Sequence, residues 1–475
     1  MGMNASERVW RAVAIVMCAA VPAGFYVVGD LADAFPGVLT VDTPEDGPAA
    51  GPKALAEGWE RLEAPTPPSA TDLSSSSTGN DLAGDLAERM ASHATLPVVD
   101  GGLAFSVVDA ASGEVLAERE ADTALVPAST LKLLTAAAVL RSRDSEDRLV
   151  TRATVHDGVV TLVGGGDMTL SDDDLRELAR STAQLVAEQE GEAAGSVTLV
   201  LDDTALVGGE NPAWGNNGRA GGWVTPTASL ALEEGWLDGE QYGPKSADPA
   251  GDAARRFAEL LGEEGVEVTG KITDGTAPED APAAEVRSET LGELVRHTLL
   301  ISDNTTAELL AHLVAEARGE PTTPEGAAAA VEAEIRDLGA ELGVDPSVLD
   351  QLEIHDGSGL SRLDRVPPAL FAAVLAEVSS GAVPALEQIL FDVPIAGLSG
   401  TLADRFASED TRQADGLVRG KTGYLGGTAT LAGVTVLSDG RTVGYSIVVH
   451  GFDGADADAA RAAVDQVAVE MVRRP

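Results

Sequence analysis

Two residues that could act as a nucleophile and its base stand three positions apart in this sequence. Ser129 and Lys132 lie in the segment PASTLK, where a proline-led turn meets the helix-forming run LKLLTAAAVL. Residues i and i+3 share a helix face, about 4.5 Å apart along the axis, so the lysine amine can reach the serine hydroxyl. The first turn of a helix also offers unpaired N–H groups to an oxyanion. This spacing indicates a serine nucleophile activated by a lysine.

Two further motifs argue against a purely structural role for these residues, in which the serine caps a helix and the lysine is solvated. An SDN triplet at 302–304 follows the helical run 291–301, and a KTG triplet at 421–423 precedes an alternating apolar run at 428–437. Each triplet alone would fit an N-cap or a strand-edge turn. Together they supply the second hydroxyl, the amide and the second cation that such a centre needs to relay protons and hold a substrate carboxylate. The three ordered motifs therefore favour catalysis.

The composition excludes several other functions. The 475 residues include 77 acidic and 32 basic side chains, a net charge of −45, which repels nucleic acid and anionic membranes. We expect no nucleic-acid partner and interpret the charge as a solubilising surface. The six histidines are scattered without metal-ligand spacing, so we expect no metal and no cofactor. His355 beside Asp356 is interpreted as structural, because Lys132 already supplies a base.

The beginning of the chain has the pattern of an export segment. Arg8 and Arg11 precede an uncharged apolar run at 12–29, which fits either a signal peptide or an uncleaved membrane anchor. Ala32-Asp33-Ala34 could be a cleavage site, and length alone does not separate the two alternatives. The single cysteine, Cys18, lies in this run, so the mature chain has no internal disulfide. We expect an extracytoplasmic protein, secreted to the cell wall or held at the membrane by this N-terminal segment.

The remaining patterns predict an α/β (α+β) fold in which an antiparallel sheet is flanked by helices. A β-hairpin is expected at 103–108 and 114–119, two strands at 428–437 and 442–450, and a final helix at 457–472. The 170 positions between Lys132 and Ser302 exceed what one catalytic domain needs, which indicates an inserted αβ domain. Within it we expect helices at 172–188 and 253–261 and strands at 197–201 and 266–272. We place the parts at 1–35 for the signal or anchor, 36–80 for a flexible linker, 81–145 with 285–475 for the catalytic domain, and 146–284 for the insert.

In this order, PASTLK, SDN and KTG resemble the motifs of the penicillin-recognising serine enzymes. Three more stretches, GGGDMTL at 164–170, HDGSGLSR at 355–362 and PIAGLSGTLADR at 394–405, are similar to the D-alanyl-D-alanine carboxypeptidases of the penicillin-binding protein 4 type. The resemblance extends from about Leu82 to the C-terminus. It implies a transpeptidase/β-lactamase-like domain with an insertion between the first two motifs. The insertion is short for that family, and we expect one of its two usual inserted domains to be absent or reduced.

The resemblance implies a role for each catalytic residue. Ser129 attacks the carbonyl between the terminal D-alanines and forms an acyl-enzyme, while Lys132 takes its proton. Ser302 passes that proton to the leaving amine, and Asn304 orients Lys132 and the substrate amide. Lys421 is the cation for the terminal carboxylate. A neutral Lys132 amine is required at the moment of attack, which desolvation and the charge of Lys421 would favour.

Four further residues are expected to bind substrate. Thr422 and Gly423 complete the carboxylate-binding triplet, and the N–H groups of Ser129 and Tyr424 are the expected oxyanion hole. Tyr424 stands where the family usually has Ser or Thr. Relatives that recognise diaminopimelate use an arginine and a carboxylate from the inserted domain. Arg362 stands at the position of that arginine, but the loop at 214–219, which is comparable to the one that carries the carboxylate, offers amides and no carboxylate.

The function implied is a serine D,D-peptidase of peptidoglycan, a carboxypeptidase with endopeptidase activity left open. Its partners would be stem peptides and β-lactam antibiotics, with possible membrane contact through the N-terminus and an unspecified oligomeric state. A β-lactamase is the first alternative, but motifs 170 and 117 positions apart are dispersed for a compact β-lactamase, and no deacylating glutamate is identifiable. A non-catalytic wall-binding protein on the same fold is the second alternative.

Overall fold

The structure is a computed structural model that describes residues 79–99, 102–191, 195–237 and 243–473. The predicted signal or anchor at 1–35 lies outside the described residues, as does the predicted linker apart from its last two positions. Within the part of the chain that is described, no single helix is long and apolar enough to cross a membrane. One bent pair, Pro368–Ser380 with Pro384–Asp392, meets that test by length and composition.

A five-stranded sheet joins the two ends of the described chain. Its strands are β1 (Leu103–Asp109), β2 (Val115–Arg119), β11 (Arg419–Leu425), β12 (Thr428–Val436) and β13 (Thr442–His450). The order is β11-β12-β13-β1-β2, and every neighbouring pair is antiparallel. The predicted hairpin and the predicted β12 and β13 are confirmed. Because β1 pairs with β13, the sheet forms only when residues more than 300 positions apart meet.

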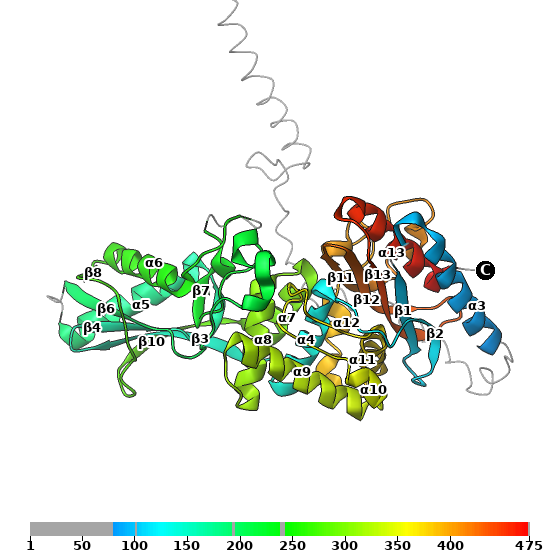
Figure 1. Ribbon diagram of the computed structural model, residues 1–475. Coiled ribbons are helices and arrows are strands. Elements are labelled where there is room, and N and C mark those ends of the chain that lie inside the picture. Colours follow the sequence, from blue (N-terminus) through cyan, green and yellow to red (C-terminus); the bar gives the residue numbers. More distant parts are fainter. Residues whose placement is uncertain (1–78, 100–101, 192–194, 238–242, 474–475) are drawn as a thin grey trace, which may run out of the picture. The chain divides into compact units, whose positions relative to one another are not determined.

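Helices cover both faces of this sheet, as the sequence predicted. On one face, α3 (Gly79–Ser92) and α13 (Ala457–Val472) share an apolar core with the strands. On the other face, α11 (Pro368–Ser380) packs on β13 and β1. A Cβ on Gly444 of β13 would overlap the backbone of α11, so glycine is required where helix and strand approach most closely. Figure 1 shows this layered arrangement around β1 and β13.

A second core lies among the helices beside the sheet. It is formed by α4 (Leu131–Ser142), α7 (Leu291–Ile301), α8 (Asn304–Arg318), α9 (Pro324–Glu341), α10 (Pro346–Leu349), α11 and α12 (Ile389–Asp392). Every residue of α4 from Leu131 to Leu140 is buried, because its leucines and alanines are packed on all sides. Lys132 belongs to this run and is drawn into the core with it.

A second sheet is built from the residues between α4 and α7. Its strands are β3 (Arg148–His156), β4 (Val159–Val163), β6 (Ser196–Asp202), β8 (Glu267–Val268), β9 (Thr273–Asp274) and β10 (Ala283–Thr290), in the order β10-β3-β4-β6-β8 with β9 also paired to β6. The helices α5 (Asp172–Glu190) and α6 (Pro249–Glu263) share its core. The short strands β5 (Asp167–Leu170) and β7 (Leu230–Leu232) pair separately.

The sequence prediction was wrong in one part of this region. A single strand was expected at 266–272, but the pairing is divided between β8 and β9, because the chain turns at Gly270 with a φ of +82°. The helix predictions for α5 and α6 are confirmed, with ends within four residues. The boundaries of the insert at 146–284 stay a prediction, and β10 continues the second sheet as far as Thr290.

Candidate active site

The nucleophile candidate stands on a strained turn. Ser129 lies in a 3₁₀ turn, Ala128–Thr130, directly before α4, so it precedes the helix that was expected to carry it. Ala128 has a φ of +49°, in the left-handed region that alanine seldom adopts. A Cβ on Gly359 would overlap the Ala128 carbonyl oxygen, so the HDGSGLSR loop packs closely against this turn. Surrounding structure thus holds Ala128, and with it the turn that carries the serine, in a conformation that alanine alone would not favour.

Lys132 is completely buried beneath Ser129. Its Nζ donates to Ser129 Oγ at 3.2 Å, to Asn304 Oδ1 at 2.7 Å and to the Ser358 carbonyl oxygen at 2.7 Å. Burial lowers the pKa of this amine to about 8, although nearby carboxylates favour its charged form. The amine can therefore lose a proton near neutral pH and accept one from the serine hydroxyl.

The SDN triplet forms the break between α7 and α8. Ser302 ends α7 in the left-handed region with a φ of +66°, and the Asp303 carboxylate caps α8 by accepting the Thr306 N–H at 2.6 Å. This turn brings Ser302 and Asn304 to the side that faces Ser129. The Asn304 amide connects two parts of the chain, since its Nδ2 donates to the Trp223 carbonyl oxygen at 2.9 Å while its Oδ1 accepts from Lys132.

The KTG triplet lies within β11, a strand that the sequence did not predict. Lys421 is fully buried and donates from Nζ to Ser302 Oγ and to the Thr422 carbonyl oxygen, both at 2.9 Å. Burial, and after it the charge of Lys132, lower the pKa of the Lys421 amine well below its usual value. A Cβ on Gly423 would lie 3.1 Å from Ser129 N, so glycine lets this strand pass directly beside the nucleophile.

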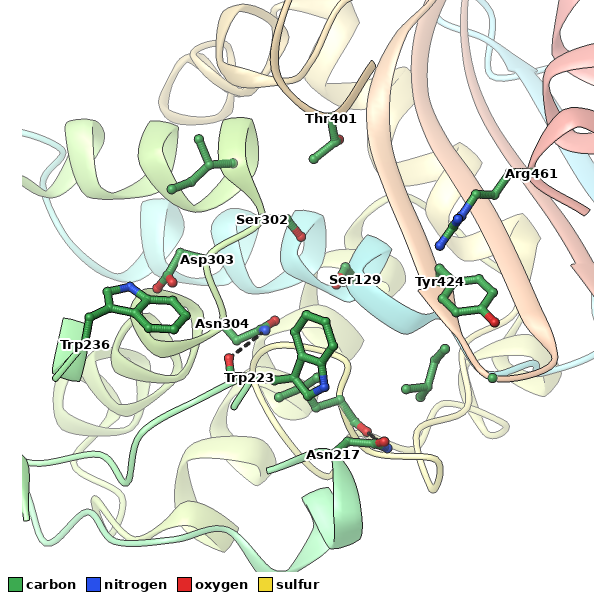
Figure 2. Close-up of a pocket in the computed structure, with 14 residues that line it drawn as sticks. Ser129, Asn217, Trp223, Trp236, Ser302, Asp303, Asn304, Thr401, Tyr424 and Arg461 are labelled. Carbon is green, nitrogen blue, oxygen red and sulfur yellow. Dashed lines mark hydrogen bonds between the residues drawn. The ribbon is translucent and has the colours of Figure 1, made fainter. Parts of the chain in front are cut away.

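A pocket of about 440 Å³ opens above these residues (Figure 2). Of the predicted site residues, Ser129, Ser302, Asn304 and Tyr424 line it, whereas Lys132 and Lys421 lie behind its wall. Arg362 is at its edge, where Nη1 donates to the Gly426 carbonyl oxygen at 2.9 Å. The structure therefore brings all nine predicted residues to one place. Sequence reasoning assigned no role to Trp223, Trp236, Thr401 or Arg461, which also line the pocket.

The carboxyl groups of Glu308, Asp356 and Asp364 are buried behind Lys132, and the sequence did not indicate a role for them. Glu308 accepts the N–H groups of Gly357 and Ser358 at 3.2 and 3.0 Å, and Asp356 accepts those of Gly359 and Ser361, both at 2.7 Å. These bonds fix the loop whose Ser358 carbonyl receives Lys132.

The pKa values of all three carboxyl groups are raised by burial: that of Glu308 to about 8, and that of Asp364 well above its usual value. The signal that could have revealed one of them is a glutamate inside the apolar helix α8. His355 is joined to this group through its backbone N–H, which donates to Asp364 at 2.8 Å.

Comparison with known proteins identifies the class of enzyme that this site defines. The chain matches the D-Ala-D-Ala carboxypeptidase 3 (S13) family over residues 86–246 and 238–471, and it belongs to that family. It is thus a serine D,D-peptidase, which confirms the resemblance that its motifs carry.

Two relatives and one solved structure show how far the similarity extends. The carboxypeptidase DacB of Mycolicibacterium smegmatis is 34% identical over 426 residues, 86% of each chain. The carboxypeptidase Rv3627c of Mycobacterium tuberculosis is 32% identical over 362 residues, 73% of this chain and 76% of that protein. The fold is similar to that of penicillin-binding protein 4 (dacB) from Haemophilus influenzae, with a TM-score of 0.61 and 19% identity over 81% of this chain and 97% of that one. The predicted fold class is confirmed.

Because Glu308 binds the loop that contacts Lys132, we expect it to position that loop. Glu308→Ala should leave the N–H groups of Gly357 and Ser358 unpaired in the core. Each unpaired N–H group should cost about 1–3 kcal/mol of stability. The freed loop should also move the Ser358 carbonyl away from Lys132 and slow acylation. Glu308→Gln, which keeps one acceptor, should lose less on both counts.

Thermal unfolding and the rate of labelling by a fluorescent penicillin measure these two effects. Glu316→Ala is the matched control, because Glu316 lies on the same helix but is exposed and pairs only with Arg143, so it should change stability by less than about 0.5 kcal/mol. Unchanged melting and labelling in Glu308→Ala would remove Glu308 from this role.

The lowered pKa of Lys132 generates a second prediction. Because the neutral amine accepts the serine proton, the acylation rate should rise as pH increases through about 8 and level off above it. Lys132→Arg keeps a cation that stays protonated throughout this range, so it should have almost no activity at any pH within it. A rate of serine acylation that stays flat between about pH 6 and 9 would contradict Lys132 as the base.

Proposed function

We propose that the protein releases the terminal D-alanine from peptidoglycan stem peptides by way of an acyl-enzyme on Ser129. The observation that carries this proposal is the contact of 3.2 Å between Lys132 Nζ and Ser129 Oγ at the floor of the pocket, with Asn304 bound to the same amine. Two relatives at 34% and 32% identity are named carboxypeptidases, which supports the same reaction.

In the first half of the reaction, Ser129 Oγ attacks the carbonyl carbon of the penultimate D-alanine as its proton passes to Lys132. The resulting oxyanion would be stabilised by the N–H groups of Ser129 and Tyr424. When the C–N bond breaks, the leaving amine takes up a proton, and Ser302 is the hydroxyl placed to relay it. Water then attacks the ester and regenerates the serine.

The same serine would be acylated by β-lactam antibiotics, because their strained amide presents a carbonyl and a carboxylate in the arrangement of the peptide terminus. The long-lived adduct expected of a D,D-peptidase separates this protein from a β-lactamase, which would hydrolyse the adduct rapidly. Labelling at Ser129 also separates it from a wall-binding protein without activity.

The catalytic proposal is tested by incubating the full chain with a stem peptide that ends in D-Ala-D-Ala. Wild type should release D-alanine, and Ser129→Ala should lower the rate by roughly 10³-fold or more, because it removes the hydroxyl that contacts Lys132. Mass analysis of digested whole peptidoglycan shows at the same time whether cross-linked dimers are also cleaved. Equal release by wild type and Ser129→Ala would refute the mechanism.

Since peptidoglycan lies outside the cytoplasm, we also propose that the protein is exported by its N-terminal segment. In intact cells, a membrane-impermeant fluorescent penicillin should label the full chain, whereas a chain that lacks residues 1–35 should remain inside and unlabelled. Labelling of the shortened chain to the same extent as the full chain would show that the segment does not direct export.

A further inference from the structure

The charged side chains that line the pocket differ in sign from one side to the other, while Arg362 remains at its edge, bonded to the Gly426 carbonyl oxygen. Among the described residues that line it, Arg461 is the one with a cationic side chain and Asp303 is the one with an anionic side chain. Figure 2 shows Arg461 and Asp303 on opposite sides of Ser129. An anionic group near the nucleophile is therefore attracted toward Arg461 and repelled from Asp303.

Arg461 reaches the pocket from α13, the last helix, and its side chain is 39% exposed. Its guanidinium lies over the Tyr424 ring, 4.3 Å from the ring centroid, and this contact directs it toward the pocket. Of its five N–H donors, Nη1 bonds to Asp458, whose side chain is 97% exposed, so this exposed ion pair holds the guanidinium weakly.

The backbone at Arg461 is held in place by a partly buried contact. Arg405 donates from Nη2 to the Arg461 carbonyl oxygen at 3.0 Å and binds both oxygens of Asp465 at 3.0 and 2.7 Å. Arg405 belongs to the same segment as Thr401, whose hydroxyl lies 2.7 Å from that of Thr422. The Thr401 hydroxyl and the Arg461 guanidinium thus line the pocket, and the Thr422 hydroxyl lies directly behind that of Thr401.

A substrate that ends in D-alanine needs a cation near the nucleophile, because only one nitrogen and one Cα separate its carboxylate from the carbonyl under attack. Lys421 was expected to provide this charge, but it is fully buried behind the pocket wall, and burial favours its neutral form. Arginine keeps its charge, and its fork of donors fits a carboxylate. In a protein with a net charge of −45, a local cation also offsets the repulsion of an anionic substrate.

We propose that Arg461 binds the terminal carboxylate of the substrate and thereby determines that this site takes peptides with a free C-terminus. Thr401 and Thr422 supply the neighbouring hydroxyl donors. This inference rests on the proposed peptidase function, and it assigns to the last helix a role that no sequence motif indicated.

The test compares matched substrates with and without the charge. The full chain is given an acyl-D-Ala-D-Ala peptide with a free carboxylate and the same peptide with a C-terminal amide. Arg461→Ala should lower kcat/KM for the free acid by about 10- to 100-fold, mostly through KM, and change that for the amide by less than about twofold. Arg461→Lys should recover part of the loss. Asp458→Asn, which removes only the exposed partner of Arg461, should stay within about twofold of wild type on both.

Acylation of Ser129 by benzylpenicillin and by its methyl ester gives a second readout that does not require peptide hydrolysis. Arg461→Ala should slow acylation by the free acid and leave that by the ester near the wild-type rate. If wild type cleaves neither peptide, the proposed function fails, while the two penicillins still test Arg461. Equal losses on the charged and the neutral member of either pair, or no loss on both, would overturn the role of Arg461.

Discussion

The burial of the Lys132 amine is the constraint on which the rest of the site depends. An ammonium group taken from water into an apolar core is costly unless several acceptors surround it. Here the acceptors come from three separate parts of the chain: the Ser129 turn, the start of α8 at Asn304, and the loop carbonyl of Ser358. The apolar faces of α4 draw the lysine inward, and the three acceptors must converge for that burial to be tolerated. Folding of the helical core and assembly of the active site are thus the same event.

Amines and carboxyl groups are buried together behind the pocket wall. The amines of Lys132 and Lys421 are both buried, and the buried carboxyls of Glu308 and Asp356 lie near Lys132, with Asp364 beside Asp356. Burial pushes each of these groups toward its neutral form: it lowers the amine pKa values and raises those of the carboxyls. The lowered pKa of Lys132 leaves its amine able to accept the proton that the serine hydroxyl gives up.

The sequence predicted those elements whose periodicity is local. α13 was expected at 457–472 and occupies Ala457–Val472, because its apolar positions repeat at helical spacing. β11 was missed because Gly420 and Gly423 weaken a strand pattern. These glycines are required by tertiary contacts: a Cβ on Gly420 would overlap the Ala432 carbonyl oxygen of β12, and one on Gly423 would crowd Ser129.

The motifs predicted the candidate site residues, and the structure places them together, although their roles stay predictions. What no local pattern could indicate is which side chains of distant elements complete the site. Arg461 is one of several charged residues on its helix, and tertiary contacts, the packing of α13 on the sheet and the Tyr424 ring, direct it to the pocket. Glu308 likewise gains its importance from the loop N–H groups that fold back onto it.

Residues 211–223 support the catalytic residues as well as lining part of the pocket. Asn211 donates to the His355 carbonyl oxygen, Asn217 to that of Leu360, and Trp214 Nε1 to Glu308. Because the Trp223 carbonyl binds Asn304, this segment also sets the orientation of the amide that holds Lys132. A change in these residues, two of which line the pocket, would then also move the Lys132 amine by way of Asn304. The same hydrogen bonds thus hold both this wall of the pocket and the amide that binds Lys132.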